Sequence, residues 1–171
     1  MNIKTVKVGY LQTNCYIIEY QNNTLIIDPG DEAEKIIKAV EKPVVGIIVT
    51  HHHFDHVGAL DAVKNHFHTQ IYDIHNLKEG ENKISDFNFE IIYTPGHKED
   101  LISILMDNNL FCGDFIFENG IGRFDLEGGN FSDMQKSILK ILKYDPSITI
   151  YPGHGDPTTL KKEISNLKNY V

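Results

Sequence analysis

The amino-acid sequence predicts an α/β fold, organised as one domain that spans residues 1–171. The length of 171 residues and the apolar content of 41% fit one globular domain with a buried core. Short runs rich in β-branched and aromatic residues alternate along the chain with segments in which apolar residues recur at helical spacing. No internal repeat, low-complexity tract or interdomain linker breaks this alternation.

The strands expected before residue 50 surround one helix. Pro29 and Gly30 end a first group of three strands. The helix is expected over residues 31–42, where apolar residues recur at helical spacing after Asp31, which can serve as its N-cap. A continuous apolar run then predicts a strand that is buried on both faces and leads directly into Thr50 and a histidine cluster. The expected strands of this half cover residues 6–8, 16–20, 25–27 and 44–49.

The second half of the chain continues the alternation. A helix is expected over residues 57–67, and two more, over residues 131–143 and 160–170, complete the pattern. The segment 119–130 contains four glycines, but apolar residues punctuate it, so we expect an ordered loop that lies over another part of the protein. The expected strands of this half cover residues 70–72, 89–93, 101–106, 110–112 and 148–151.

The charge balance and the two cysteines narrow the class of protein. With 24 acidic and 16 basic side chains the formal net charge is −8, which repels a polyanion, so no nucleic-acid partner is expected. The chain does not start like an export signal, and no apolar segment approaches the ~18 residues of a membrane span. We therefore expect a cytoplasmic protein with no membrane partner. Cys15 and Cys112 lie in apolar, strand-like runs, which favours buried reduced thiols over a disulfide.

Residues 51–56 read His-His-His-Phe-Asp-His and provide the main functional signal. Four candidate metal ligands, His51, His53, Asp55 and His56, fall within six residues directly after a buried strand. Nitrogen and carboxylate ligands suit a borderline cation such as zinc, and catalytic zinc sites keep one position open for water. On an extended segment His51 and His53 point the same way, and the turn that follows can direct Asp55 and His56 to a second point nearby. This arrangement predicts two adjacent metal ions rather than a solvated histidine-rich turn.

Three more residues follow other expected strands. His97 stands in Thr-Pro-Gly-His and His154 in Tyr-Pro-Gly-His, so the same strand-then-Pro-Gly-His arrangement occurs twice. Asp114 follows the strand at 110–112; alone it would more often be a turn residue, but beside the histidines a carboxylate that bridges two cations is the better interpretation. The remaining histidines show no such placement and are expected at the solvent-facing surface: His52, His66, His68 and His75.

These motifs together resemble the metallo-β-lactamase superfamily, and the resemblance extends over nearly the whole chain. A narrower set of segments resembles the glyoxalase II group of hydroxyacylglutathione hydrolases. The superfamily motifs are His51-x-His53-x-Asp55-His56, Thr94-Pro95-Gly96-His97, Gly113-Asp114 and Pro152-Gly153-His154-Gly155. The narrower segments are Asn14-Cys15-Tyr16, Asp28-Pro29-Gly30, residues 120–125, and the end segment with Thr158, Glu163 and Asn166.

The resemblance implies a four-layer αββα sandwich with two metal ions at one edge. It implies that one ion is held by His51, His53 and His97, that the other is held by Asp55, His56 and His154, and that Asp114 bridges them. Asp28 is implied as a supporting residue and not a ligand. The chain departs from the pattern after His97, where it carries Lys98 and Asp100, and it stops at Val171 without the helical domain that full-length glyoxalase II uses for glutathione.

The chemistry expected from this site is thioester hydrolysis. Two cations lower the pKa of a shared water toward ~7, so that hydroxide forms at neutral pH, and a thiolate of pKa ~8.5 leaves with little need of a general acid. We assign catalytic roles to Asp55 and Asp114 through the metals that they hold, and we expect zinc, with iron or manganese as alternatives. The expected partner is a small-molecule thioester such as hydroxyacylglutathione, bound by a monomer or homodimer.

Other functions fit the same sequence. A mononuclear iron persulfide dioxygenase of this superfamily would use the equivalents of His51, His97 and Asp114 alone. A noncatalytic metal-binding protein on the same fold is a further alternative, although the ligand set is complete, and a β-lactamase is less favoured without an export signal. Lys98 and Arg123, which is the single arginine of the chain, are both candidates to contact an anionic substrate. For Arg123 the alternative is that it fixes its own loop by pairing with Asp125 or another acid.

Overall fold

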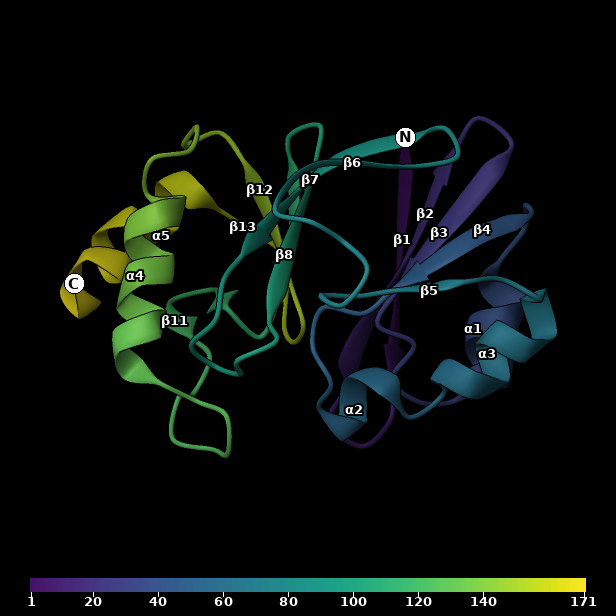
Figure 1. The fold of residues 1–171 in the computed structure, drawn as a ribbon, viewed down its shortest axis with the longest axis horizontal. Helices are drawn as coiled ribbons and strands as arrows, with labels where there is room; N and C mark the ends of the chain where they lie inside the picture. The colour runs from purple at the N-terminus through teal and green to yellow at the C-terminus, as the bar shows by residue number, and fades with distance from the viewer.

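Two mixed β-sheets face one another in the computed structural model, which describes residues 1–171, and helices cover the outer side of each sheet (Figure 1). The four layers are therefore helices, sheet, sheet and helices. This is the αββα sandwich that the sequence predicts. No helix is long and apolar enough to cross a bilayer.

The first sheet has the strand order β1-β2-β3-β4-β5. The first three strands are antiparallel neighbours, whereas β3, β4 and β5 run parallel. Its strands are β1 (Asn2–Val8), β2 (Thr13–Tyr20), β3 (Asn23–Ile27), β4 (Val44–Ile48) and β5 (Ile71–Tyr72). Helices α1 (Ala33–Ala39) and α3 (Leu60–Phe67) lie on its outer face (Figure 1).

The second sheet has the strand order β13-β12-β9-β8-β7-β6, in which only β12 and β9 are parallel neighbours. Helices α4 (Phe131–Ile141) and α5 (Leu160–Leu167) cover its outer face (Figure 1), and the short helix η1 (Lys168–Tyr170) follows α5. The strands are β6 (Gly80–Ile84), β7 (Phe87–Tyr93), β8 (Ile102–Met106), β9 (Asn109–Gly113), β12 (Thr149–Pro152) and β13 (Thr158–Thr159). A two-stranded hairpin, β10 (Ile116–Phe117) and β11 (Gly120–Ile121), and the one-turn helix α2 (Phe54–Val57) complete the elements.

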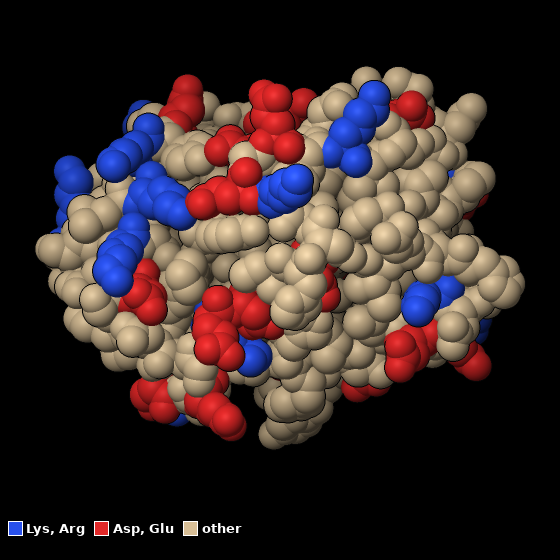
Figure 2. Space-filling model, in the orientation of Figure 1, with Lys and Arg blue, Asp and Glu red and all other residues tan.

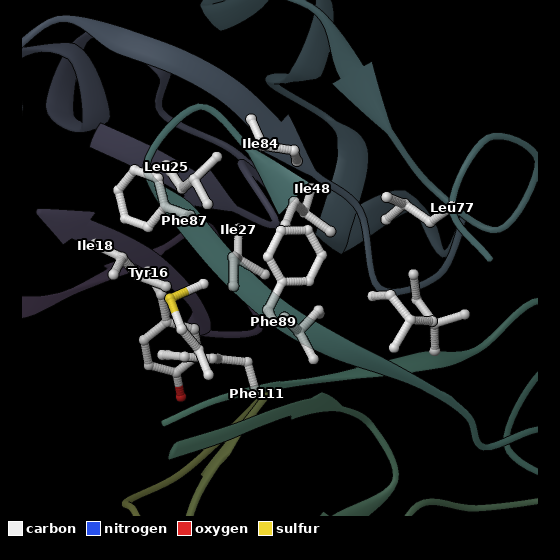
Figure 3. Packing of buried hydrophobic residues seen from close by; sticks show 14 residues of the cluster. Tyr16, Ile18, Leu25, Ile27, Ile48, Leu77, Ile84, Phe87, Phe89 and Phe111 are labelled. Atoms are coloured by element: carbon white, nitrogen blue, oxygen red, sulfur yellow. The ribbon is translucent and has the colours of Figure 1, made fainter. Parts of the chain in front are cut away.

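The apolar runs of the central strands are explained by burial on both faces. Leu25 and Ile27 of β3 point into the core between the two sheets, whereas Ile26 points to the layer under α1 and α3. In β4, Ile48 likewise points into the core between the sheets, and Ile47 points to the layer under α1 and α3. Figure 3 shows side chains from both sheets in the central core. Because alternate residues enter two apolar layers, these strands contain unbroken apolar runs instead of an alternating pattern.

The helix expected over residues 57–67 begins only at Leu60, and Val57 belongs instead to the separate one-turn helix α2. Gly58 lies against the backbone of Gly30, where an added Cβ would come within 2.4 Å of the carbonyl oxygen, and Ala59 N donates to Pro29 O at 3.0 Å. This contact ends α2 at Val57, and α3 starts at Leu60. The prediction was therefore wrong about where the helix begins, and the separate turn α2 carries two of the predicted metal ligands.

The N-cap of α1 and several strands also differ from the prediction, which did not include β6, β10, β11 or β13. Asp31 is not the N-cap of α1: the cap position is Glu32, with φ of 49°, and the Asp31 carboxylate accepts from the Glu32 backbone N–H instead. The strand β6 was missed because its polar sequence, at the sheet edge, has no apolar run. Cys15 and Cys112 are both free and buried, as expected.

Candidate metal centre

All seven predicted ligand side chains lie together at one edge of the sandwich. Each follows the end of a strand or stands on the turn of helix beside it. His51 and His53 follow β4, His97 follows β7, Asp114 follows β9 and His154 follows β12, while Asp55 and His56 belong to α2. The two sheets therefore deliver ligands from distant parts of the sequence to one point between them.

The ligand atoms form two groups of three. In the first group, His51, His53 and His97, the three nitrogens lie within 4.8 Å of one another, and His53 Nδ1 is 2.9 Å from His97 Nε2. The second group is Asp55, His56 and His154, again within 4.8 Å. There Asp55 Oδ2 is 3.1 Å from His154 Nε2 and 3.4 Å from His56 Nε2.

Asp114 lies between the two groups. Its Oδ1 atom is 3.3 Å from His56 Nε2, and its Oδ2 atom is 3.5 Å from both His97 Nε2 and His154 Nε2. One carboxylate thus faces members of both groups, which is the position a bridging ligand takes.

Unpaired atoms test whether cations fit these residues. His51 Nε2, His56 Nε2 and Asp114 Oδ1 are buried and have no hydrogen-bond partner. Such atoms are rare in folded proteins because their desolvation is not compensated. All three face the centre of the cluster, where a divalent cation would accept their lone pairs. The nitrogen and oxygen donor set therefore fits two borderline or hard divalent cations.

Asp28 orients ligands from behind. It lies in a third group within 4.8 Å, with His51 and His56. Both of its carboxylate oxygens are already occupied, because they accept from Thr50 N at 2.8 Å, Thr50 Oγ1 at 2.6 Å and His56 Nδ1 at 2.8 Å. We therefore assign Asp28 to the support of His56, whose Nε2 atom it directs toward the centre of the cluster.

Backbone carbonyls hold two other imidazoles. His97 Nδ1 lies 2.7 Å from the carbonyl oxygen of Arg123, and His154 Nδ1 lies 3.1 Å from that of Leu11. Donation from Nδ1 fixes the tautomer that presents Nε2 to the centre. The turn that carries His154 is held by Asn14, whose amide donates to Pro152 O and Gly155 O.

Gly153 is required where it stands. A Cβ at this position would come within 2.2 Å of Asp114 Oδ1 and 2.7 Å of His56 Cε1. The ligands therefore pack directly against the backbone of this turn, so the glycine of Pro152-Gly153-His154 has a steric cause.

The protonation of the cluster is uneven. Burial, together with the neighbouring His56, holds the pKa of His51 well below its usual range, and burial also lowers the pKa of His53. Burial acts in the same direction on His56, but Asp28 and Asp114 outweigh it and raise its pKa to about 10. For His154, burial is likewise outweighed by Asp114 and Asp55, and its pKa rises to about 9. Without metal, the first group therefore has two neutral imidazoles, and the second has two that carry protons at pH 7.

The cluster opens into a cavity of about 640 Å³. Its walls combine ligand residues with apolar side chains from α2, β10 and two loops. Besides the ligands, Arg123 is the one ionisable residue that lines it, and its guanidinium pairs with Asp125 at 2.8 and 2.9 Å. The apolar wall residues are Leu11, Phe54, Phe117 and Leu126.

The sequence-predicted substrate residues and surface histidines have other contacts. Lys98 does not line the cavity, and its ammonium is 3.9 Å from Asp100 Oδ1. His52 is at the surface, but its ring bridges two carboxylates, with Nδ1 2.6 Å from Asp100 and Nε2 3.3 Å from Asp73. Asp100, the departure noted in the sequence, thus helps to hold the first metal-ligand loop.

Sequence reasoning missed two threonines. Thr13 Oγ1 donates to Asp55 Oδ2 at 2.8 Å, and Thr50 Oγ1 lies between Asp28 and His51 Nδ1, 3.0 Å from the latter. The position of Thr50 beside the histidine cluster is a usable signal. Thr13 is 42 residues away from its partner and gave none.

Comparison with known proteins agrees with this geometry. The family model of the metallo-β-lactamase superfamily matches residues 8–79 and 70–154. The hydroxyacylglutathione hydrolase GloC of Haemophilus influenzae is 33% identical, over 95% of this chain and 95% of that protein. Among solved structures, the BLEG-1 B3 metallo-β-lactamase has a TM-score of 0.91 at 31% identity, over 96% of this chain and 97% of that chain. The di-iron-bound form of TTHA1623 has a TM-score of 0.87 at 28% identity, over 95% and 98% of the two chains.

The chain belongs to the metallo-β-lactamase superfamily. With its histidine and aspartate metal-binding groups, it is a metal-dependent hydrolase of that fold.

Proposed function

We propose that this protein hydrolyses small acyl thioesters at a site with two divalent metal ions. The observation that carries the proposal is the composition of the cavity. Apart from the ligand set, its lining offers apolar side chains and one paired arginine, and no further carboxylic acid, histidine or lysine.

The ligand residues would hold one cation at His51, His53 and His97 and the other at Asp55, His56 and His154, with Asp114 shared. Cations bound there supply Lewis acidity, which polarises a carbonyl oxygen and lowers the pKa of water. Asp28, Arg123 O and Leu11 O keep the imidazoles oriented. The apolar wall residues exclude bulk water from one side of the cavity and strengthen the electrostatic interactions inside it.

The missing proton donor selects the leaving group. An amide nitrogen must be protonated as its bond breaks, whereas a thiol of pKa about 8.5 leaves readily as the anion. Arg123 does not supply a proton, because a guanidinium stays protonated in proteins. The name of the Haemophilus relative, a hydroxyacylglutathione hydrolase, gives independent support for a thioester substrate.

One competing activity, β-lactam hydrolysis, has specific support, whereas persulfide oxidation is disfavoured. The 31% identity to a B3 metallo-β-lactamase favours β-lactam hydrolysis, although that reaction expels an amine. A persulfide dioxygenase would need His51, His97 and Asp114 alone. Here Asp55, His56 and His154 are assembled as well, which favours two metals. Zinc is the proposed metal, and the di-iron form of the 28% identical relative supports iron as the alternative.

A substrate panel tests the proposal. Protein loaded with zinc, iron or manganese is assayed on lactoyl-glutathione, on the acetyl thioester of N-acetylcysteamine, on a chromogenic cephalosporin, and for oxygen uptake with a persulfide. The proposal expects thioester hydrolysis that Asp114→Asn abolishes. β-Lactam turnover or oxygen uptake without thioester hydrolysis would replace it with the corresponding activity.

A further inference from the structure

Large apolar side chains are exposed around the mouth of the metal cavity. Tyr10 is 96% exposed and Phe54 is 76% exposed, and Leu11 and Leu126 beside them are also exposed. These four are among nine such residues on the whole chain. A group of exposed apolar side chains on a folded domain marks a surface that binds something apolar.

A second hollow continues the cavity on this side. It has a volume of about 310 Å³ and shares Leu11, Phe54 and Asp55 with the metal cavity. From there it extends along Val8 at the end of β1 and along Gly9 and Tyr10 of the β1–β2 connection to Gly30 and Asp31. The two hollows therefore adjoin one another at Leu11, Phe54 and Asp55, and we name them together the Leu11–Phe54 groove.

The groove is fixed to the metal centre by hydrogen bonds. His154 Nδ1 contacts Leu11 O at 3.1 Å, and Gly9 N donates to Glu32 Oε2 at 2.9 Å. Gln12 N donates to Gly9 O at 3.2 Å and closes the loop on itself. Because both ends of the loop are held, the groove exists before substrate binds. Binding therefore does not carry the entropy cost of ordering a flexible loop.

The charges along the groove disfavour a substrate with carboxylates. No basic side chain lines the second hollow, and its far end carries Asp31. The one arginine of the metal cavity, Arg123, is paired with Asp125. In Figure 2, basic side chains gather mainly at the end of the molecule formed by α4 and α5, whereas acidic and uncharged side chains predominate near α2. The carboxylates of an anionic thiol such as glutathione would find no basic partner along the second hollow and would lie near Asp31.

We propose, on the basis of the thioester hydrolysis proposed above, that the Leu11–Phe54 groove binds an uncharged apolar chain attached to the thioester. The chain lies across Leu11 and Phe54 while the carbonyl group lies at the metal centre. Either the acyl chain or the carbon chain of the thiol can supply this chemistry, and the two sources are separated by experiment.

Two substrate series measure the effect. In one, the acyl chain on N-acetylcysteamine grows from acetyl to hexanoyl; in the other, the acetyl group is kept and the thiol grows from ethanethiol to hexanethiol. Complete burial of one methylene raises kcat/KM roughly fourfold, and burial of half of its surface raises it about twofold. We therefore expect kcat/KM to rise about 16-fold over four methylenes in one of the series, and that series identifies the chain that binds.

Matched variants assign the effect to the groove. Phe54→Ser should reduce the hexanoyl-to-acetyl ratio, or the corresponding thiol ratio, at least threefold. Leu139→Ser is the matched control, because Leu139 is an apolar side chain on α4 that is 51% exposed and lines neither hollow. This variant should leave the ratio unchanged. Flat series in both arms, or equal effects of the two variants, would overturn the assignment.

A binding measurement separates this inference from the proposed activity. Uncleavable alkyl thioethers of increasing length are titrated into metal-free wild type and Phe54→Ser by calorimetry. Affinity that grows with chain length in wild type and not in the variant supports the groove even if no thioester is hydrolysed, and affinity independent of length overturns it. Sedimentation that finds a wild-type dimer, dissociated by Phe54→Ser, would assign this face to a second copy of the chain and likewise overturn it.

Discussion

Replacement of Asp28 by asparagine tests how the site is held together. Asp28 has φ of 52°, in the left-handed region that asparagine tolerates better than most residues, so the backbone strain stays small. The carboxylate now accepts three hydrogen bonds, from Thr50 N, Thr50 Oγ1 and His56 Nδ1. An amide has one acceptor oxygen and an NH₂ group, so at least one of these donors would face another donor.

The expected loss concerns the metal held by His56. Removal of a carboxylate behind a metal-bound imidazole typically costs 10–100-fold in metal affinity, or about 1.4–2.7 kcal/mol. We expect Asp28→Asn to weaken the binding of the zinc ion held by His56 by this amount. The affinity for the ion at His51, His53 and His97 should change less. Thr50 couples the two positions, because it also contacts His51 Nδ1 at 3.0 Å, so the second effect is not zero.

Competition with a chromogenic chelator measures both affinities. Asp31→Asn is the matched control, because Asp31 is an exposed acid three residues away that contacts no ligand. Two zinc affinities within threefold of wild type in Asp28→Asn would refute the argument that Asp28 orients His56. Thermal unfolding of the metal-free variant checks that the fold is intact.

Three further predictions concern the same centre. Asp55→Ala should reduce the metal content from two ions to one and lower kcat/KM about 100-fold or more, while the variant still folds. Elemental analysis measures the metal content and circular dichroism checks the fold. A variant that retains two ions would contradict the prediction. The pKa values of His56 and His154 are raised to about 10 and about 9, so each imidazole must lose a proton before it binds metal. Between pH 6.5 and 8.5 the ion held by Asp55, His56 and His154 should therefore bind up to about 100-fold more tightly for each unit of pH. Calorimetry in buffers of different ionisation enthalpy measures this, and an affinity that does not change with pH would be inconsistent with it. Gly122→Ala should destabilise the protein by about 1–3 kcal/mol, because its Cβ would come within 1.8 Å of Asp114 O, whereas Gly120→Ala, with nothing within 4 Å, should change the melting temperature little.

Much of the fold could be predicted from local patterns. The buried strands β3 and β4 have unbroken apolar runs, the helices α4 and α5 have strong helical apolar periodicity, and each element was placed within a few residues. The polar strand β6 was missed because only its pairing with β7 makes it a strand. The break between α2 and α3 was missed for a similar reason, since the contact of Gly58 with Gly30 involves residues 28 positions apart.

The sequence by itself determined which side chains could hold metal, because histidine and aspartate after strand ends form recognisable short patterns. It also determined that these strands are buried, since their apolar runs have no other favourable place. The tertiary structure alone decided how the ligands are oriented: the Asp28 contact with His56, the Thr13 contact with Asp55 and the carbonyl partners of His97 and His154. These contacts depend on distances set by the packing of two sheets, and backbone carbonyls have no residue type that a sequence pattern could reveal. For the same reason, the Leu11–Phe54 groove exists only once the β1–β2 connection and α2 lie side by side.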